Sequence, residues 1–99
     1  MSWRAGKAGA DGPASLRNIG PAMLADFKLL GIGTVAQLAE EDADALYLRL
    51  CKLTDARQDP CVHDTFAAAI HQARTGEALA WWDFTTARKA RVKSGSLTL

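Results

Sequence analysis

The chain has 99 residues, of which 48% are hydrophobic and 23% charged, which suits one globular domain with a modest core and excludes an enzyme cleft between two domains. Its formal net charge of +1 gives no overall sign that would favour one class of partner. Because there is no membrane-length apolar run and no leader-like apolar segment, we expect a cytoplasmic protein that does not contact the membrane, with both cysteines reduced.

The first predicted elements are a flexible arm and two helices. Residues 1–12 are rich in Gly, Ala and charge and lack periodicity, which predicts a flexible N-terminal arm. Residues 11–18 can form a short first helix. The second predicted helix covers residues 21–30, with proline at the first helical position and Gly31 as its stop. Its apolar residues recur at helical spacing: Met23, Leu24, Phe27 and Leu30.

Three further helices have clear start signals. Thr34 and Gln37 form a capping box that predicts a short helix over residues 35–39. Asp42 can cap a fourth helix, and Asp59 followed by proline predicts the start of a fifth. The predicted apolar face of the fourth helix is Leu46, Leu50 and Leu53, with Tyr47 and Cys51 beside it. The fifth carries a one-sided stripe of Val62, Phe66, Ala69, Ile70 and Ala73, with Phe66 at the centre of the core.

The charges of the chain are separated along the sequence. Residues 38–64 hold seven acids against three bases, a balance of −4, whereas residues 85–99 hold four bases and no acid, a balance of +4. We therefore expect an acidic face and a basic C-terminal tail, with a sixth helix over residues 85–92 as an alternative form of that tail. Since no segment alternates with a period of two, the predicted fold is a compact all-α domain of five to six helices.

The turn before the second helix is the most informative part of the chain. Gly20 lets the backbone approach a ligand closely or adopt positive φ, and Asn18 tolerates a left-handed conformation. Such a turn presents backbone N–H groups and the positive end of a helix dipole, which is what a phosphate needs.

This pattern resembles the helix-hairpin-helix module, whose hairpin generally binds the nucleic-acid backbone without reading sequence. The chain departs from it at two places: Asn18 replaces the first hairpin glycine, and Ala22 stands where DNA binders often have Lys or Arg. We assign the module to residues 13–84 and the basic tail to residues 85–99. The residues expected to contact DNA are Arg17, Asn18, Ile19, Gly20, Pro21, Ala22, Met23, Lys28, Arg88, Lys89, Arg91 and Lys93.

Two functions stay open. The first is a small non-enzymatic protein that binds nucleic-acid backbone, with DNA as the expected partner. The second is a protein–protein adaptor in which the hairpin is purely structural, and the acidic residues 40–44 or the Trp81-Trp82 pair meet another protein. Ala22 favours the adaptor, whereas the basic tail favours DNA.

A wider resemblance covers residues 16–84. The pairs Leu46-Tyr47 and Leu50-Cys51, the run 59–64 and the pair Trp81-Trp82 resemble the small bacterial pathogenicity locus proteins with a helix-hairpin-helix motif, some of which are called mitomycin resistance proteins. The resemblance implies the fold, and it carries no settled biochemical activity.

Few residues of the chain suggest chemistry. Cys51, Cys61, His63 and His71 do not have the spacing of a zinc site, so we expect no metal. A redox pair of the two cysteines remains an alternative to a packing role, because Cys61 lies in a first helical turn, where the dipole favours thiolate. We expect no catalytic residues, no cofactor and no small-molecule ligand. Of the adjacent tryptophans, one is expected to close the core and the other to lie near the surface.

Overall fold

The computed structural model describes residue 12 and residues 15–99. These residues form five α-helices and one 3-10 helix, and no strand occurs among them, which confirms the all-α prediction. Within this part of the chain, no helix combines the length and apolar character that a membrane crossing requires. The elements are α2 (Pro21–Leu30), α3 (Val35–Ala39), α4 (Ala43–Thr54), α5 (Pro60–Thr75), η3 (Trp81–Phe84) and α6 (Thr85–Ser94).

The N-terminal caps set these boundaries as the sequence predicted. Thr34 and Gln37 form the capping box of α3, in which each side chain bonds the main-chain N–H of the other at 3.1 Å. The Asp42 carboxylate accepts the N–H of Ala45 at 3.0 Å, and Asp59 caps α5 in the same way. The predicted bounds of α2 and α3 are confirmed.

The predicted N-terminal arm and most of the predicted first helix lie outside the described residues. In the described part, residue 15 has 3-10 conformation and residues 16–18 form a bend and a turn, so none of them is in an α-helix. Ser15 donates from its main-chain N–H and its hydroxyl to the Gly12 carbonyl, at 3.2 and 3.0 Å. The first helix of a helix-hairpin-helix module is therefore not confirmed.

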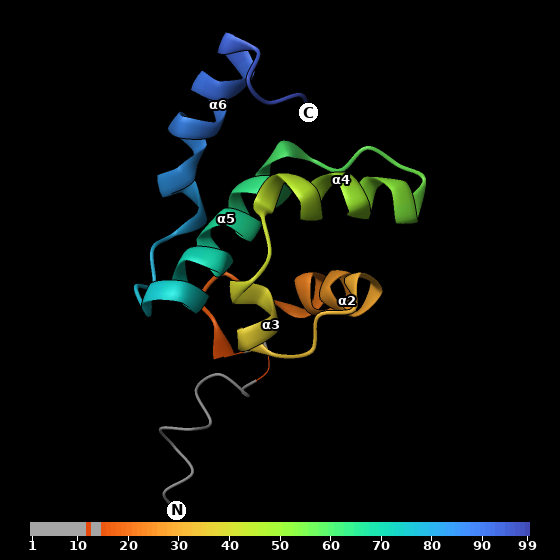
Figure 1. Cartoon of the computed structure of the whole chain (residues 1–99), viewed down its shortest axis with the longest axis vertical. Coiled ribbons are helices and arrows are strands. Elements are labelled where there is room, and N and C mark those ends of the chain that lie inside the picture. Colours follow the sequence, from red (N-terminus) through yellow and green to blue (C-terminus); the bar gives the residue numbers. More distant parts are fainter. Residues whose placement is uncertain (1–11, 13–14) are drawn as a thin grey trace, which may run out of the picture.

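Helix α5 is the centre of the molecule, and the other elements pack around it (Figure 1). Phe66 is completely buried, and its ring centroid lies 5.7 Å from that of Phe27 on α2, which confirms its predicted place in the core. The buried surface of α5 is wider than the predicted one-sided stripe, because α3, α4, η3 and α6 all contact this helix. Three polar side chains on α5 are consequently buried as well: His63, Asp64 and Thr65.

The predicted inner face of α4 is wrong at one position. Leu53 is 55% exposed, whereas Tyr47 is 1% exposed and packs the edge of its ring against that of His63 at 6.0 Å. The buried face is centred on Leu46, Tyr47 and Leu50 and is thus rotated away from Leu53. Leu53 also lies in the last turn, where Asp55 at φ 52° ends the helix.

The C-terminal segment is ordered on the body of the protein. The short-helix alternative is confirmed, since α6 covers Thr85–Ser94, and a flexible tail is the wrong description of this segment. None of the side chains of α6 itself is fully buried, but the chain after it returns and buries Leu97 to 6% exposure. The contacts that hold α6 are therefore polar ones.

Candidate functional site

The turn before α2 owes its shape to Asn18 and not to Gly20. Asn18 has a left-handed φ of 74°, the conformation that its residue type tolerates. Gly20 has φ −104° and ψ −174°, an extended conformation that any residue adopts, so of its two predicted roles the positive φ is not observed. In the described structure, a Cβ atom added at Gly20 would meet no atom within 4 Å, which means that the backbone there is open to solvent.

The same turn is fixed to the loop that follows α5. The Asn18 side chain donates to the Leu79 carbonyl at 2.9 Å and accepts the main-chain N–H of Trp81 at 3.2 Å. The Arg17 guanidinium donates to the carbonyl of Ala78 at 2.9 Å. These bonds between distant parts of the chain hold the turn in place, so part of the donor capacity of Arg17 is already used.

The N-terminus of α2 differs from those of α3, α4 and α5. Gly20 provides no side-chain cap, and the first turn contains no acidic residue. Among the described residues, none accepts a hydrogen bond from the N–H groups of Ala22 and Met23. Because Gly20, Pro21 and Ala22 are all exposed, this helix end presents unpaired donors and a positive dipole to solvent.

The other residues expected near this turn have different roles. Ile19 and Met23 are partly buried against the core, so they can offer only main-chain groups to a ligand. Lys28 lies in the last turn of α2, about 10 Å along the axis from Pro21. The structure therefore does not place the Lys28 charge beside the unpaired N–H groups.

Two of the four basic residues expected to bind DNA from the tail form ion pairs with carboxylates of the protein itself. The Arg88 guanidinium donates to both carboxylate oxygens of Asp64 at 2.8 and 3.0 Å, and the Thr85 hydroxyl donates to the same carboxylate at 2.8 Å. Asp64 is completely buried, and its bond raises the pKa of Arg88. The expectation of a free cation at Arg88 is wrong, because this side chain neutralises a buried charge.

Arg91 belongs to a second polar cluster, which the sequence did not reveal. Its guanidinium donates to the two oxygens of Asp44 at 3.2 and 2.7 Å, and His63 lies 2.7 Å from the same carboxylate through Nε2. The bond from Arg91, followed by that from His63, lowers the pKa of Asp44. The sequence signal for both clusters is the pairing of a segment with an excess of acids and one with an excess of bases.

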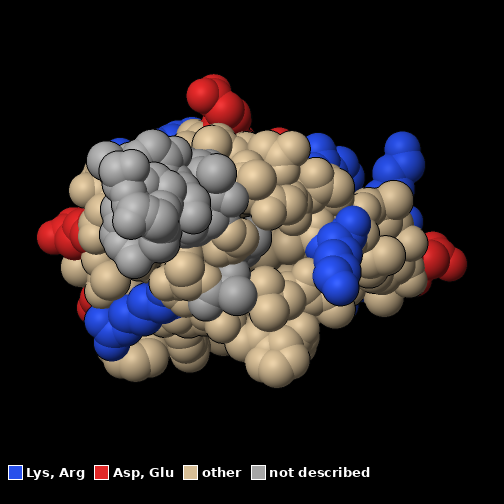
Figure 2. Space-filling view, turned by 90° about the horizontal axis from the view of Figure 1, so that it is seen from below, with Lys and Arg blue, Asp and Glu red and all other residues tan. Residues whose placement is uncertain are grey.

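The remaining predicted cations, Lys89 and Lys93, are exposed on α6. Helix α6 extends toward the end of the molecule opposite to α2 (Figure 1). Figure 2 shows that the described Lys and Arg side chains on the face seen from below stand apart from one another. The predicted DNA-binding residues therefore form two separate regions and not one basic patch.

The two cysteines do not form a disulfide. Cys51 and Cys61 are half-buried free thiols. Burial, and then the Asp59 carboxylate, raise the pKa of the Cys61 thiol, which is opposite to the direction expected from its place in the first turn of α5. No group of three potential metal ligands occurs in the part of the chain that the structure describes.

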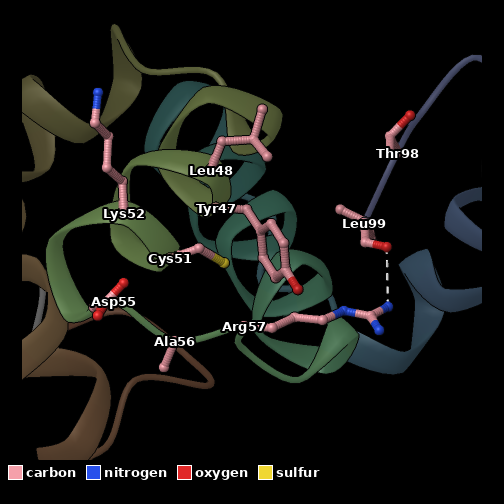
Figure 3. Close-up of a pocket in the computed structure, with 9 residues that line it drawn as sticks. All are labelled: Tyr47, Leu48, Cys51, Lys52, Asp55, Ala56, Arg57, Thr98 and Leu99. Atoms are coloured by element: carbon pink, nitrogen blue, oxygen red, sulfur yellow. Dashed lines mark hydrogen bonds between the residues drawn. The ribbon is translucent and has the colours of Figure 1, made fainter.

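A cavity of about 500 Å³ lies beside α4, in the size range of small-molecule sites. Figure 3 shows Tyr47, Cys51 and Leu99 directed toward it, and the Arg57 guanidinium bonds the Leu99 carbonyl at 2.9 Å. The Tyr47 hydroxyl donates to the carbonyl of Gln58, whose N–H bonds the sulfur of Cys51 at 3.4 Å. The Tyr47 hydroxyl and the Arg57 guanidinium, two of the polar groups that line the cavity, are thus paired within the protein. The lining residues are Tyr47, Leu48, Cys51, Lys52, Asp55, Ala56, Arg57, Thr98 and Leu99.

The tryptophan pair divides only in part as expected, because neither residue is fully buried and Trp81 is not part of the hydrophobic core. Trp81 is half-buried, and Trp82 is 59% exposed. The exposed ring lies beside Arg17, whose guanidinium carbon is 5.9 Å from the ring centroid. This contact was not predicted from the sequence, because 65 positions separate the two residues in the chain.

Comparison with known proteins identifies a family and a curated relative. The Pathogenicity locus family model matches residues 11–90. The relative is the mitomycin resistance protein McrB of Streptomyces lavendulae, which is 37% identical over 75 residues that cover 76% of this chain and 71% of the relative. No solved structure matches the chain.

Proposed function

The chain belongs to the Pathogenicity locus family, and we propose that it is a non-enzymatic protein that binds the phosphate backbone of nucleic acid, primarily DNA, without reading sequence. In this proposal, residues 18–21 are the turn of a helix-hairpin-helix module and α2 is its second helix. The proposed location is the cytoplasm. Mitomycin resistance, which gives the relative its name, belongs to that protein and is not carried over to this chain.

The open N-terminus of α2 is the observation that supports this proposal most. In three helices of the protein the side chain of Thr34, Asp42 or Asp59 accepts a bond from one N-terminal N–H group, whereas α2 begins at an exposed glycine without such a cap. Phosphate oxygens can accept hydrogen bonds from such N–H groups and interact favourably with the helix dipole. This mode contacts every nucleotide in the same way, so it carries no sequence information.

The proposal is tested by fluorescence anisotropy with labelled single-stranded and duplex DNA over a series of salt concentrations. We expect a dissociation constant that rises linearly with salt on logarithmic axes, because bound counterions are released from the phosphates. Absence of binding at low salt would contradict the proposal.

A matched pair of variants locates the site. Ala22 and Ala36 are both exposed and both stand at the second position of a helix, in α2 and in α3. Ala22→Asp places a carboxylate at the open helix end, where it interacts favourably with the helix dipole, so the fold should be retained. The same carboxylate repels phosphate and should lower the affinity for DNA by about tenfold. Ala36→Asp changes the net charge equally at a capped helix end, and its binding should stay within about twofold of the parent.

A second variant blocks the approach without adding charge. Gly20→Val should retain the turn, because the backbone is extended and no described atom lies within 4 Å of the new Cβ. The branched side chain would cover the neighbouring N–H groups and weaken DNA binding. Normal affinity of a folded Gly20→Val protein would place the binding site elsewhere.

One observation favours the alternative function, a protein–protein adaptor. Three leucines on α2 and α4 are more than half exposed: Leu29, Leu48 and Leu53. The acidic region considered for this role is less available, because Asp42 caps α4 and Asp44 bonds Arg91 and His63. The adaptor becomes the favoured function if DNA does not bind at low salt.

A further inference from the structure

We infer that the exposed indole of Trp82 stacks on an unpaired base, so that the nucleic acid preferred by this protein is single-stranded. This inference rests on the proposed function and narrows its substrate class. It starts from Trp82 itself, which is 59% exposed although tryptophan is among the residues that gain most from burial.

The indole is held in position by its neighbours. The Trp81 ring meets it edge to face, with centroids 5.6 Å apart and an interplanar angle of 84°. The Arg17 guanidinium lies 5.9 Å from the centroid and is itself fixed by its bond to the Ala78 carbonyl. The ring, with the guanidinium over it, is thereby held in a fixed position, which reduces the entropy that a ligand must overcome on binding.

The segment that carries the indole is bonded to the turn before the open end of α2. Asn18 bonds the main chain of Trp81, the residue before the exposed indole, and it precedes Gly20 by two positions. The main-chain N–H of Arg17 donates to Gln72 of α5 at 2.9 Å, which fixes the other side of the turn. The phosphate donors at the start of α2 and the ring of Trp82 therefore stay in a constant relation to each other.

A nucleotide has the matching chemistry, since it carries both a flat base and an anionic phosphate. In a duplex the faces of the bases are stacked on each other and unavailable to a surface indole. In a single strand they are free, and aromatic side chains stack on them with little dependence on sequence. Stacking on Trp82 is thus compatible with backbone binding that does not read sequence.

The test compares the binding of a labelled oligothymidine strand with that of a mixed-sequence duplex of equal length, and it uses the whole 99-residue chain. Trp82→Leu keeps an apolar side chain but removes the ring, and we expect it to weaken single-strand binding by about 5- to 150-fold while leaving duplex binding unchanged. Trp82→Phe should restore part of the affinity, because it restores an aromatic face. Leu53→Ala, which truncates another exposed side chain, should leave both affinities unchanged.

Two further results decide the inference. Addition of the strand should quench tryptophan emission in the parent protein and quench it less in Trp82→Phe. Single-strand binding that survives Trp82→Leu, or an equal loss on both DNAs, overturns the stacking inference while salt-dependent binding preserves the proposed function. Failure of both DNAs to bind overturns the proposed function and the inference with it.

Discussion

The two regions of the sequence that were predicted to contact DNA, the turn before α2 and the C-terminal segment, differ in what the folded protein leaves available to a ligand. The C-terminal segment carries four cations, but Arg88 and Arg91 bond carboxylates of the protein's own α5 and α4. The turn carries less charge, yet its main chain is exposed and uncapped where α2 begins. Formal charge in a sequence thus overestimates the charge available to a ligand, whereas unpaired backbone donors are invisible to any charge count.

The greatest loss of stability is expected from a variant that tests whether Arg88 is structural. Asp64→Asn removes one partner of a buried ion pair and should lower the free energy of unfolding by about 3–5 kcal/mol, because Arg88 is left without its counter-charge. Urea denaturation measures this loss. The double variant Asp64→Leu with Arg88→Leu should recover much of the stability, since neither buried charge remains. A single variant as stable as the parent would show that the pair is open in solution.

A smaller loss is expected at the turn. Asn18→Ala should lower the free energy of unfolding by about 2–3 kcal/mol, because alanine is strained at positive φ and the bonds to Leu79 and Trp81 are lost. Asn18→Gly keeps the φ preference while removing the same bonds, so its loss should be smaller. Equal losses for the two variants in urea denaturation would show that backbone strain contributes nothing and that the side-chain bonds alone hold the turn.

The sequence predicted those parts of the fold that depend on local chemistry. The helix starts at residues 35, 43 and 60 follow from side-chain caps that Thr34, Asp42 and Asp59 provide within three residues of themselves. The burial of Asp64 and the exposure of Leu53 depend on which helices surround α5 and how α4 is rotated. No periodicity within one helix contains that information, because it is set by contacts between distant segments.

The candidate site shows the same division. The left-handed Asn18 was predictable from its residue type, whereas the extended Gly20 was not, since glycine adopts many conformations. The partners of Arg17, Arg88 and Arg91 lie tens of positions away in the chain. A long cationic side chain reaches whatever acceptor the fold brings near it, and only the folded structure identifies that acceptor.

Acid should loosen the contact between α6 and α4. The pKa of Asp44 lies below its ordinary value because Arg91 and then His63 bond the carboxylate. The ionised form therefore stabilises the folded state above the unfolded pKa of about 3.9, and this contribution is lost as the pH falls through the lowered pKa. Unfolding free energies measured from about pH 6 to pH 2 should show this loss in the parent. Asp44→Asn, compared with the parent over the same range, should show a weaker dependence on acid.

The smallest change in stability is expected from variants that remove the exposed cations of α6, which are the ones available to DNA. Truncation after Phe84 cannot test it, because the shortened chain would lose the Arg88 partner of buried Asp64 and unfold in part. Lys89→Ala with Lys93→Ala removes only the two exposed cations and should change the unfolding free energy by less than about 0.5 kcal/mol each. If α6 contacts the DNA, the slope of the logarithm of the binding constant against the logarithm of the salt concentration should become shallower by about 2 units. The four cations of the segment in the sequence would imply a change of about 4 units. An unchanged slope would mean that the open end of α2 binds phosphate without help from α6.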